Sequence, residues 1–342
     1  MEYLGTFPAG FSTLVQHLML RDSILEQVIF YDESIIAFYS EKHLSTLPYL
    51  KNLYPLLEWG QAENIFSAYQ LMLQKPFIKK LTPLVKLKAH CTFTIRVFIE
   101  GKPAPIIRDL HGMLEKKLAQ SIHGRPNSEQ PELEFQLHVR KNHHCYLILQ
   151  QQKYPKYIDE RLLPGALPPY FCRLLLELSD PQREDIFLDP FMGSGAIPLE
   201  RARMAPYHMI FTGDIDPEKV QHFKIILKHK EWEKRRKTIF PKVLDATTLG
   251  QFQQGFITRI VTDPPWGLYE ALEANKIRTL YIRFLKESAR ILAPKGRMVL
   301  LVSATIPLAD LLKAAEVPLV IKQGIQVLVS GQKALVYVII PE

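Results

Sequence analysis

The residues with the clearest chemical potential are Asp263, Pro264, Pro265 and Trp266, which follow a short apolar run at residues 257–261. An amine attached to an aromatic ring is a weak nucleophile, because its lone pair is delocalised into the ring. A carboxylate and a backbone carbonyl that accept its two N–H bonds restore nucleophilicity, and Asp263 and Pro264 supply these groups. The prolines fix φ and hold the carbonyl in place, while Trp266 offers a face for stacking a base, worth roughly 1–3 kcal/mol. We therefore predict a catalytic loop for transfer to an exocyclic amine, against the alternative of a proline-rich loop around a buried tryptophan.

A second motif lies at residues 187–195, where an apolar strand leads through a glycine turn into a helix expected at residues 196–204. Gly193 and Gly195 allow the backbone to approach a ligand closely, and the free N–H groups of a helix N-terminus can hold a carboxylate. Asp189, at the end of the strand, can accept bonds from the turn or from the ammonium of a ligand. For the two glycines alone, an ordinary tight turn would be the preferred interpretation.

Acidic residues end the next two expected strands. Asp214 stands where a carboxylate can accept hydrogen bonds from both ribose hydroxyls of a ligand. Asp216 competes for that role, but its position before Pro217 predicts a helix N-cap. Asp245 follows a third strand at residues 242–244, where it can accept a bond from an adenine amino group or form an ordinary turn. Both interpretations of Asp245 stay open.

Short apolar runs alternate with helical patterns from residue 158 onward, at residues 186–188, 209–211, 242–244, 257–261 and 298–302. Strands that alternate with helices predict a parallel sheet covered on both faces. The segments 325–329 and 334–340 predict a final antiparallel hairpin. This α/β, Rossmann-like topology is typical of class I methyltransferases.

The preceding residues predict an α+β architecture. Apolar and polar side chains alternate at residues 92–99 and 133–139, which indicates strands with one buried face. A helix is expected at residues 105–122 and a further strand at 145–149. Residues 1–57 contain short strand-like runs but no chemical motif. We therefore expect three domains, with the bounds 1–57, 58–157 and 158–342.

Composition sets further bounds on function. The chain has 43 Lys and Arg against 35 Asp and Glu, a net charge of +8, which suits a polyanionic partner. No apolar run reaches the ~18 residues that span a membrane, and the N-terminus does not resemble a secretory signal; we expect a cytoplasmic protein. Cys91, Cys145 and Cys172 lack CxxC spacing, so we expect buried thiols and no metal site. The basic run at residues 228–237, with Trp232 inside it, predicts either phosphate contacts beside the pocket or a solvated helix face.

The motif at residues 189–195, followed by Asp-Pro-Pro-Trp at 263–266, resembles the amino-methyltransferase group. The order of the two motifs excludes the circularly permuted DNA adenine methyltransferases. Residues 161–170 resemble the segment that THUMP-type RNA methyltransferases carry before their first strand. The chain is therefore similar to the THUMP-domain tRNA guanine-N2 methyltransferases, although Met192 and Ala196 depart from the residues common at their positions.

This resemblance implies an N-terminal ferredoxin-like domain at residues 1–57, a THUMP-like RNA-binding domain at 58–157 and a class I methyltransferase domain at 158–342. The implied activity is methyl transfer from S-adenosyl-L-methionine to N2 of a guanosine in tRNA, in the region of the acceptor stem. We expect a monomer. The implied catalytic residues are Asp263, Pro264, Pro265 and Trp266. The implied cofactor-binding residues are Leu167, Asp189, Phe191, Gly193, Ser194, Gly195, Asp214, Ile215, Asp245, Ala246 and Asp263.

Two other functions remain open. The same catalytic loop would serve adenine-N6 or cytosine-N4 methylation of another nucleic acid. A non-catalytic RNA-binding adaptor with a vestigial methyltransferase fold is the alternative from a different class, but intact Gly193, Gly195, Asp214 and Asp263 argue against it.

Overall fold

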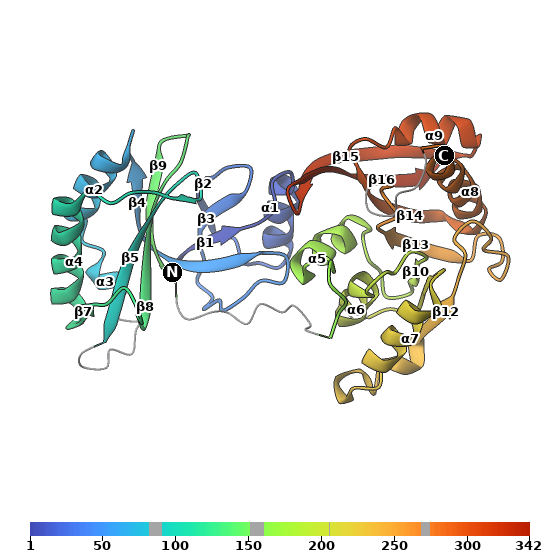
Figure 1. Cartoon of the computed structure of the whole chain (residues 1–342), viewed down its shortest axis with the longest axis horizontal. Helices are drawn as coiled ribbons and strands as arrows, with labels where there is room; N and C mark the ends of the chain where they lie inside the picture. The colour runs from blue at the N-terminus through green and yellow to red at the C-terminus, as the bar shows by residue number, and fades with distance from the viewer. Residues whose placement is uncertain (82–90, 151–160, 205, 268–273) are drawn as a thin grey trace. The chain divides into compact units, whose positions relative to one another are not determined.

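The computed structural model of the chain describes residues 1–81, 91–150, 161–204, 206–267 and 274–342 (Figure 1). The chain divides into two compact units. One combines residues 1–7 with 16–156, and the other combines residues 8–15 with 157–342. Among the described residues, no helix has the length and apolar character needed to cross a membrane.

The first unit is built on one nine-stranded sheet, in the order β2-β3-β1-β4-β9-β8-β5-β6, with β7 paired to β5. Its elements are β1 (Glu2–Thr6), β2 (Gln27–Tyr31), β3 (Ile35–Tyr39), β4 (Asn52–Gln61), α2 (Ile65–Gln74), α3 (Ile78–Leu81), β5 (Thr92–Ile99), β6 (Lys102–Pro103), α4 (Arg108–Ile122), β7 (Arg125–Pro126), β8 (Leu133–Val139) and β9 (His144–Gln150). The residues of α1 (Ser12–Arg21) are divided between the two units.

The strand–helix–strand–strand pattern expected in this unit is confirmed. β5 and β8 have the bounds that the alternating side chains predict, and they pair in parallel, while β8 and β9 pair antiparallel. The apolar face of these strands packs against α2 and α4, with Phe93, Leu114 and Leu118 in one buried cluster. β4 runs through the boundary expected between residues 57 and 58, because its first half pairs with β1 and its second half with β9.

The second unit contains the predicted α/β sheet, in the order β12-β11-β10-β13-β14-β16-β15. Its elements are α5 (Pro169–Leu178), β10 (Ile186–Asp189), α6 (Ala196–Arg203), β11 (Met209–Asp214), α7 (Pro217–Ile226), the 3₁₀ helices η1 (Lys230–Trp232) and η2 (Arg236–Thr238), β12 (Ile239–Val243), β13 (Ile257–Thr262), α8 (Ala274–Ile291), β14 (Leu292–Ser303), α9 (Leu308–Ala315), β15 (Leu319–Val329) and β16 (Gln332–Pro341).

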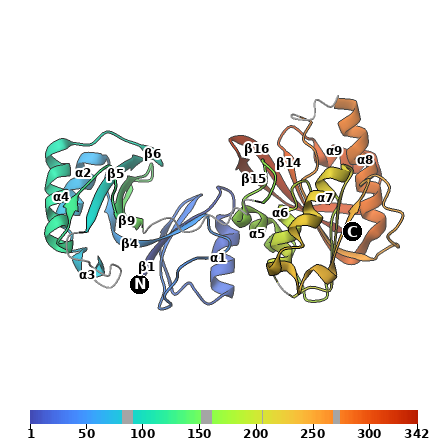
Figure 2. The same ribbon diagram turned by 60° about the horizontal axis from the view of Figure 1, so that its bottom comes forward.

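The first five strands of this sheet pair in parallel, and β16 pairs antiparallel with both β14 and β15. The prediction of a parallel sheet that ends in an antiparallel hairpin is therefore confirmed. α8 and α9 cover one face, where Phe284, Leu285 and Leu308 join the main buried cluster. Figures 1 and 2 show α5, α6 and α7 on the other side of the sheet. The sheet is thus covered on both faces, as a parallel sheet requires.

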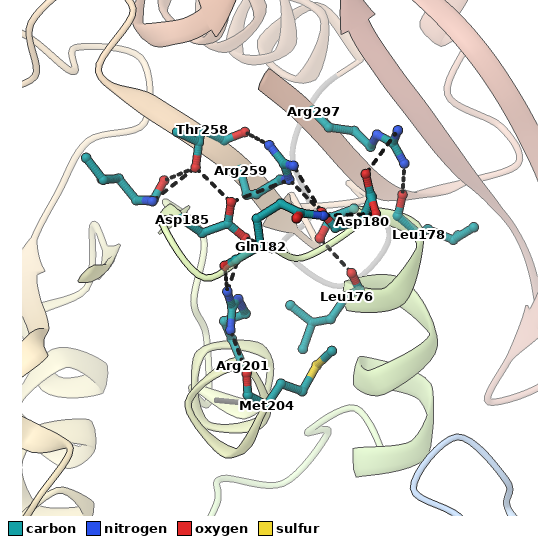
Figure 3. Close-up of polar contacts among 12 residues, drawn as sticks. Leu176, Leu178, Asp180, Gln182, Asp185, Arg201, Met204, Thr258, Arg259 and Arg297 are labelled. Atoms are coloured by element: carbon teal, nitrogen blue, oxygen red, sulfur yellow. Dashed lines mark hydrogen bonds and ion pairs between the residues drawn. The ribbon is translucent and has the colours of Figure 1, made fainter. Parts of the chain in front are cut away.

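A buried polar network fixes the amino-terminal edge of this sheet (Figure 3). At its centre is Asp185, which precedes β10 and is 1% exposed. Its Oδ2 accepts hydrogen bonds from Arg201 Nη2 of α6 at 3.1 Å and from the Gln182 backbone N–H at 2.7 Å. Its Oδ1 accepts from the Thr258 hydroxyl of β13 at 3.1 Å. One carboxylate therefore joins a loop, a helix and a strand.

Two further arginines extend the network along the same edge. Arg259 of β13 donates to the Asp180 carbonyl from Nε and Nη2, at 3.2 and 3.0 Å. Arg297 of β14 donates to the Leu178 carbonyl at the end of α5 and lies 3.8 Å from the exposed Asp180 carboxylate. These contacts hold β13 and β14 to the end of α5 and to the loop between α5 and β10, at the edge of the sheet opposite the ends of β10 and β13.

Removing the charge of Asp185 should destabilise the second unit strongly. The Arg201 and Asp185 side chains are 0% and 2% exposed, so Asp185→Asn leaves a buried guanidinium without its counter-charge, at a cost of about 3–5 kcal/mol. Asp180→Asn is the matched control, because its side chain is 60% exposed and surface ion pairs contribute at most about 1 kcal/mol. Urea unfolding of the two variants measures the difference. Equal effects would show that the buried pair does not hold this edge.

Candidate active site

The sheet topology brings the sequence motifs together at its carboxyl-terminal edge. β10 lies between β11 and β13, and all three run in the same direction. Asp189, Asp214 and Thr262 are the last residues of these three strands, and Asp263 follows directly. The chain passes from β10 to β11 on one side and places β13 on the other, and ligands bind at such a switch point in open α/β sheets.

The glycine turn after β10 has the geometry of a backbone cradle. Gly193 and Gly195 have φ values of +51° and +85°, a region that L side chains rarely adopt. A Cβ on Gly195 would lie 2.1 Å from the Phe223 ring of α7, so only glycine fits there. A Cβ on Gly193 would meet no atom within 4 Å among the described residues. Gly195 is the N-cap of α6, whose first N–H groups can hold a carboxylate.

Asp214 connects β11 to this turn. Its Oδ2 accepts a hydrogen bond from the Gly193 N–H at 3.0 Å, and its Oδ1 accepts from the Asp216 N–H at 3.0 Å. Lys219 Nζ lies 3.7 Å from Oδ2. Each carboxylate oxygen has two acceptor positions, so these contacts leave acceptor capacity for ribose hydroxyls. Asp216 caps α7, as predicted, by accepting from the Glu218 N–H at 2.9 Å.

Asp189 is a buried carboxyl group with one unpartnered oxygen. Its Oδ1 accepts from the Thr262 hydroxyl at 2.6 Å and from the Phe191 N–H at 3.3 Å. Its Oδ2 has no hydrogen-bond partner among the described residues, and the residue is 0% exposed. Burial, together with the negative charges of Asp263 and Asp214, raises the pKa of Asp189 to about 8. At neutral pH the ligand-free protein therefore carries this group mainly as the neutral acid.

The loop after β13 positions a carboxylate and an indole side by side. Trp266 Nε1 donates a hydrogen bond to Asp263 Oδ1 at 2.8 Å. The Tyr281 hydroxyl, from α8, donates to the Pro265 carbonyl at 3.1 Å, and this tyrosine is 0% exposed. The Asp263 carboxylate is thus oriented by its own loop, and the backbone of the loop is held by a helix on one face of the sheet.

The other predicted site residues occupy varied environments. Asp245 is exposed, and its Oδ1 accepts from the backbone N–H and the hydroxyl of Thr247, both at 2.8 Å, which is the geometry of an aspartate turn. Ile215 is 70% exposed at the end of β11, an apolar surface on which an adenine ring can pack. The Phe191 ring packs edge-on against Phe284 at 5.1 Å. Ala246 is buried.

Leu167 and Ser194 are the two remaining residues that were expected to bind the cofactor. Leu167 is half-buried, and its carbonyl accepts from the Cys172 thiol of α5 at 3.7 Å. Ser194 is half-buried within the glycine turn. Tyr281 had no functional signal in the sequence, because it stands outside the motifs. Thr262 directly precedes the Asp-Pro-Pro-Trp motif, but nothing in the sequence predicted its hydrogen bond to Asp189. Among the described residues, no group of three or more His, Cys, Asp or Glu side chains is placed to hold a metal ion.

These residues fit S-adenosylmethionine. The unpartnered Asp189 oxygen would accept from the ammonium of its methionine part, and the N-terminus of α6 would hold the carboxylate. Asp214 would accept from the ribose hydroxyls. Asp263 and Trp266 then lie at the adjacent strand end, where a base would enter.

Comparison with known proteins agrees with this arrangement. The family model described as "RMKL-like, methyltransferase domain" matches residues 158–331. A tRNA (guanine(6)-N2)-methyltransferase of Thermus thermophilus is 27% identical over 197 residues, which are 55% of this chain and 56% of that protein. A tRNA (guanine(10)-N2)-dimethyltransferase of Methanothermobacter thermautotrophicus is 31% identical over 136 residues, which are 39% of this chain and 37% of that protein. The matched residues thus span about half or less of these relatives.

Solved structures show the same fold. The crystal structure of TrmN from Thermus thermophilus aligns with a TM-score of 0.76 at 21% identity and covers 100% of both chains. The structure of SMU.472, solved in complex with SAH, aligns with a TM-score of 0.72 at 13% identity and covers 100% of this chain and 98% of that one. At these identities the alignments establish the fold alone.

The unpartnered oxygen of Asp189 leads to a prediction about pH. A pKa near 8 means that the ligand-free acid is neutral below pH 8, whereas a ligand ammonium favours the carboxylate. Binding of S-adenosylhomocysteine between pH 6.5 and 7.5 should therefore release up to about one proton, and affinity should rise as pH approaches 8. Calorimetry in two buffers of different ionisation enthalpy measures the release.

Asp189→Asn is the matched variant, since asparagine preserves the shape of the side chain and cannot titrate. It should bind S-adenosylhomocysteine more weakly and without proton release. Proton release that persists in this variant would exclude Asp189 as its source.

Proposed function

The chain belongs to the family of RMKL-like methyltransferase domains, and from this premise we propose that it transfers a methyl group from S-adenosylmethionine to N2 of a guanosine in tRNA. The product is N2-methylguanosine. The observation that carries the proposal is the pairing of the Asp263 carboxylate with Trp266 at the end of β13, beside the carboxyl groups that end β10 and β11.

Asp263, Pro264 and Trp266 have different roles in the proposed methyl transfer. The cofactor supplies a methyl group on a positively charged sulfur. Asp263 accepts a hydrogen bond from one N–H of the guanine amino group, and the Pro264 carbonyl accepts a hydrogen bond from the other N–H. These two hydrogen bonds raise the nucleophilicity of the nitrogen. The nitrogen would displace the sulfur from the methyl carbon, with the electrons of the broken carbon–sulfur bond remaining on the sulfur, and the Asp263 carboxylate is placed to take the proton that the nitrogen then loses. The Trp266 ring supplies the stacking face for the extruded base.

Guanine in tRNA is preferred as the substrate because relatives that match 35–55% of this chain are named tRNA guanine-N2 methyltransferases or dimethyltransferases. The net charge of +8 suits an RNA partner. We further propose that residues 1–57 are ferredoxin-like and that residues 58–157 are a THUMP-like domain. In this scheme the two domains grip tRNA and present a nucleotide of the acceptor-stem region, and the enzyme acts as a monomer in the cytoplasm.

Identification of the methylated nucleoside tests this proposal. The full-length chain is incubated with S-adenosylmethionine labelled in its methyl group and with unmodified tRNA, which is then digested to nucleosides. Label in N2-methylguanosine is expected. Label in N6-methyladenosine or N4-methylcytidine would instead select the other exocyclic amines, and tRNA binding without any methyl transfer would select the adaptor.

Loss of the Asp263 carboxylate should abolish methyl transfer while tRNA affinity changes little, because this group acts mainly in the transition state. In Asp263→Ala we expect kcat to fall by well over tenfold, which corresponds to more than about 1.4 kcal/mol. Asp216→Ala is the control, since this acid at the same edge caps α7 and should affect stability by about 1 kcal/mol with kcat preserved. A kcat for Asp263→Ala within tenfold of wild type would rule out the catalytic assignment.

The indole N–H of Trp266 should have an effect separate from that of its ring. Trp266→Phe keeps an aromatic face but removes the donor to Asp263, so we expect kcat to fall about tenfold, as for a hydrogen bond to a charged group, with little change in KM for tRNA. Trp266→Ala removes the stacking face as well and should also raise KM. Steady-state kinetics separates the two effects. Equal kinetics for wild type and Trp266→Phe would show that this hydrogen bond does not position Asp263.

A further inference from the structure

Residues 228–237, called here the basic segment, carry a concentration of positive charge. Six of these ten residues are Lys or Arg, against 43 in the 342 residues of the chain. Five of the six are exposed, and Arg235 is half-buried. Within the part of the chain that the structure describes, no carboxylate forms an ion pair with any of the six. These charges therefore face outward and are not neutralised by the protein.

The basic segment is folded. It forms η1 and η2 rather than one continuous helix, and the backbone N–H groups of Trp232, Arg235 and Thr238 each bond to the carbonyl three residues earlier, at 2.9 to 3.0 Å. Trp232 is 1% exposed, and the guanidinium of Arg203 lies 5.1 Å from the centre of its ring. Trp232 thus anchors the segment and has no face for a base, which restricts the segment to contacts made by its cations.

The acidic residues of the segment do little to cancel its field. Glu231 is held by two arginines from outside the segment, with Arg161 Nη2 at 2.8 Å and Arg203 Nη2 at 3.7 Å. Only Glu233 then remains to oppose six cations. Arg161 lies close to the start of the second unit, and its carbonyl also contacts His222 of α7 at 2.7 Å. Arg161 therefore lies directly beside the basic segment.

The basic segment lies away from the candidate active site. α7 starts at the carboxyl-terminal edge of the sheet, directly after β11, and β12 returns toward that edge, so the segment between them stands at the opposite edge. The expectation of phosphate contacts beside the pocket is therefore wrong in its location. β12 has five residues, which span ~16 Å at the usual rise of a strand. Lys224 on α7 and Lys242 on β12, the two elements that connect the basic segment to the active-site edge, are also exposed.

We propose that the basic segment binds the phosphate backbone of a double-stranded RNA stem next to the target nucleotide. This inference rests on the proposed tRNA substrate and names the surface that would hold it. The strip from the active-site edge to the basic segment, ~16 Å long, is long enough to follow the phosphate backbone of an RNA stem over several base pairs. Lysine-rich contacts to phosphate position an RNA without reading its sequence.

A charge-matched pair of variants tests the proposal in the full-length chain. Lys234→Gln/Arg236→Gln/Lys237→Gln removes three exposed cations from the basic segment. Lys295→Gln/Lys322→Gln/Lys333→Gln removes three exposed cations from β14, β15 and β16, so both variants lose the same net charge. The affinity for unmodified tRNA is measured by filter binding between 50 and 200 mM salt, and S-adenosylhomocysteine affinity and methyl-transfer kinetics are measured in parallel.

The basic-segment variant should lose up to about 2.7 from the slope of log affinity against log salt, because each phosphate contact contributes ~0.9. Its KM for tRNA should rise, while kcat and S-adenosylhomocysteine affinity stay at wild-type values. The β14–β16 control should keep the wild-type slope. Equal slopes for the two variants, in a wild-type protein that methylates tRNA, would overturn the proposal. Failure of the wild-type protein to bind or methylate tRNA would instead overturn the proposed function.

Discussion

The structure of the second unit depends on holding three acidic side chains together at one edge of a sheet. Asp189, Asp214 and Asp263 stand at the ends of three adjacent parallel strands, where three ionised carboxylates would repel one another. Each is stabilised differently. Asp214 accepts two backbone N–H groups and lies near Lys219. Asp263 accepts the Trp266 indole N–H. Burial and the neighbouring carboxylates raise the pKa of Asp189 to about 8.

These different surroundings support the different roles that we propose for the three acids. Asp189, whose pKa is raised, has an oxygen without a hydrogen-bond partner among the described residues that suits the ammonium group of a ligand. Asp214, which is held by the glycine turn, is suited to ribose hydroxyls. Asp263, which is half-buried beside Trp266, is suited to the amino group of a base. The polar network around Asp185 and Arg201 lies at the opposite edge of the sheet. It holds β13 and α6 to the loop before β10, and so helps to fix the strands whose other ends carry these acids.

The parallel sheet and the acids at the ends of its strands could be predicted from the sequence, because alternating strands and helices place all carboxyl-terminal strand ends at one edge. It could not show the contacts that depend on side-chain rotamers, such as the bond from Trp266 to Asp263 or the hold of Tyr281 on Pro265. Trp232 illustrates the same limit. The sequence places it among six Lys and Arg residues, and only the structure shows that its ring is buried beside Arg203. The likeness of residues 1–157 to ferredoxin-like and THUMP domains stays a prediction.

The most direct test of this account is the ionisation of Asp189 itself. Carbon-detected NMR of the Asp189 carboxyl, assigned with Asp189→Asn, follows its titration in the full-length chain with and without S-adenosylhomocysteine. The account predicts a midpoint near pH 8 in the free protein and an ionised carboxylate throughout the neutral range in the complex. A carboxyl that is already ionised at pH 6 in the free protein would contradict it.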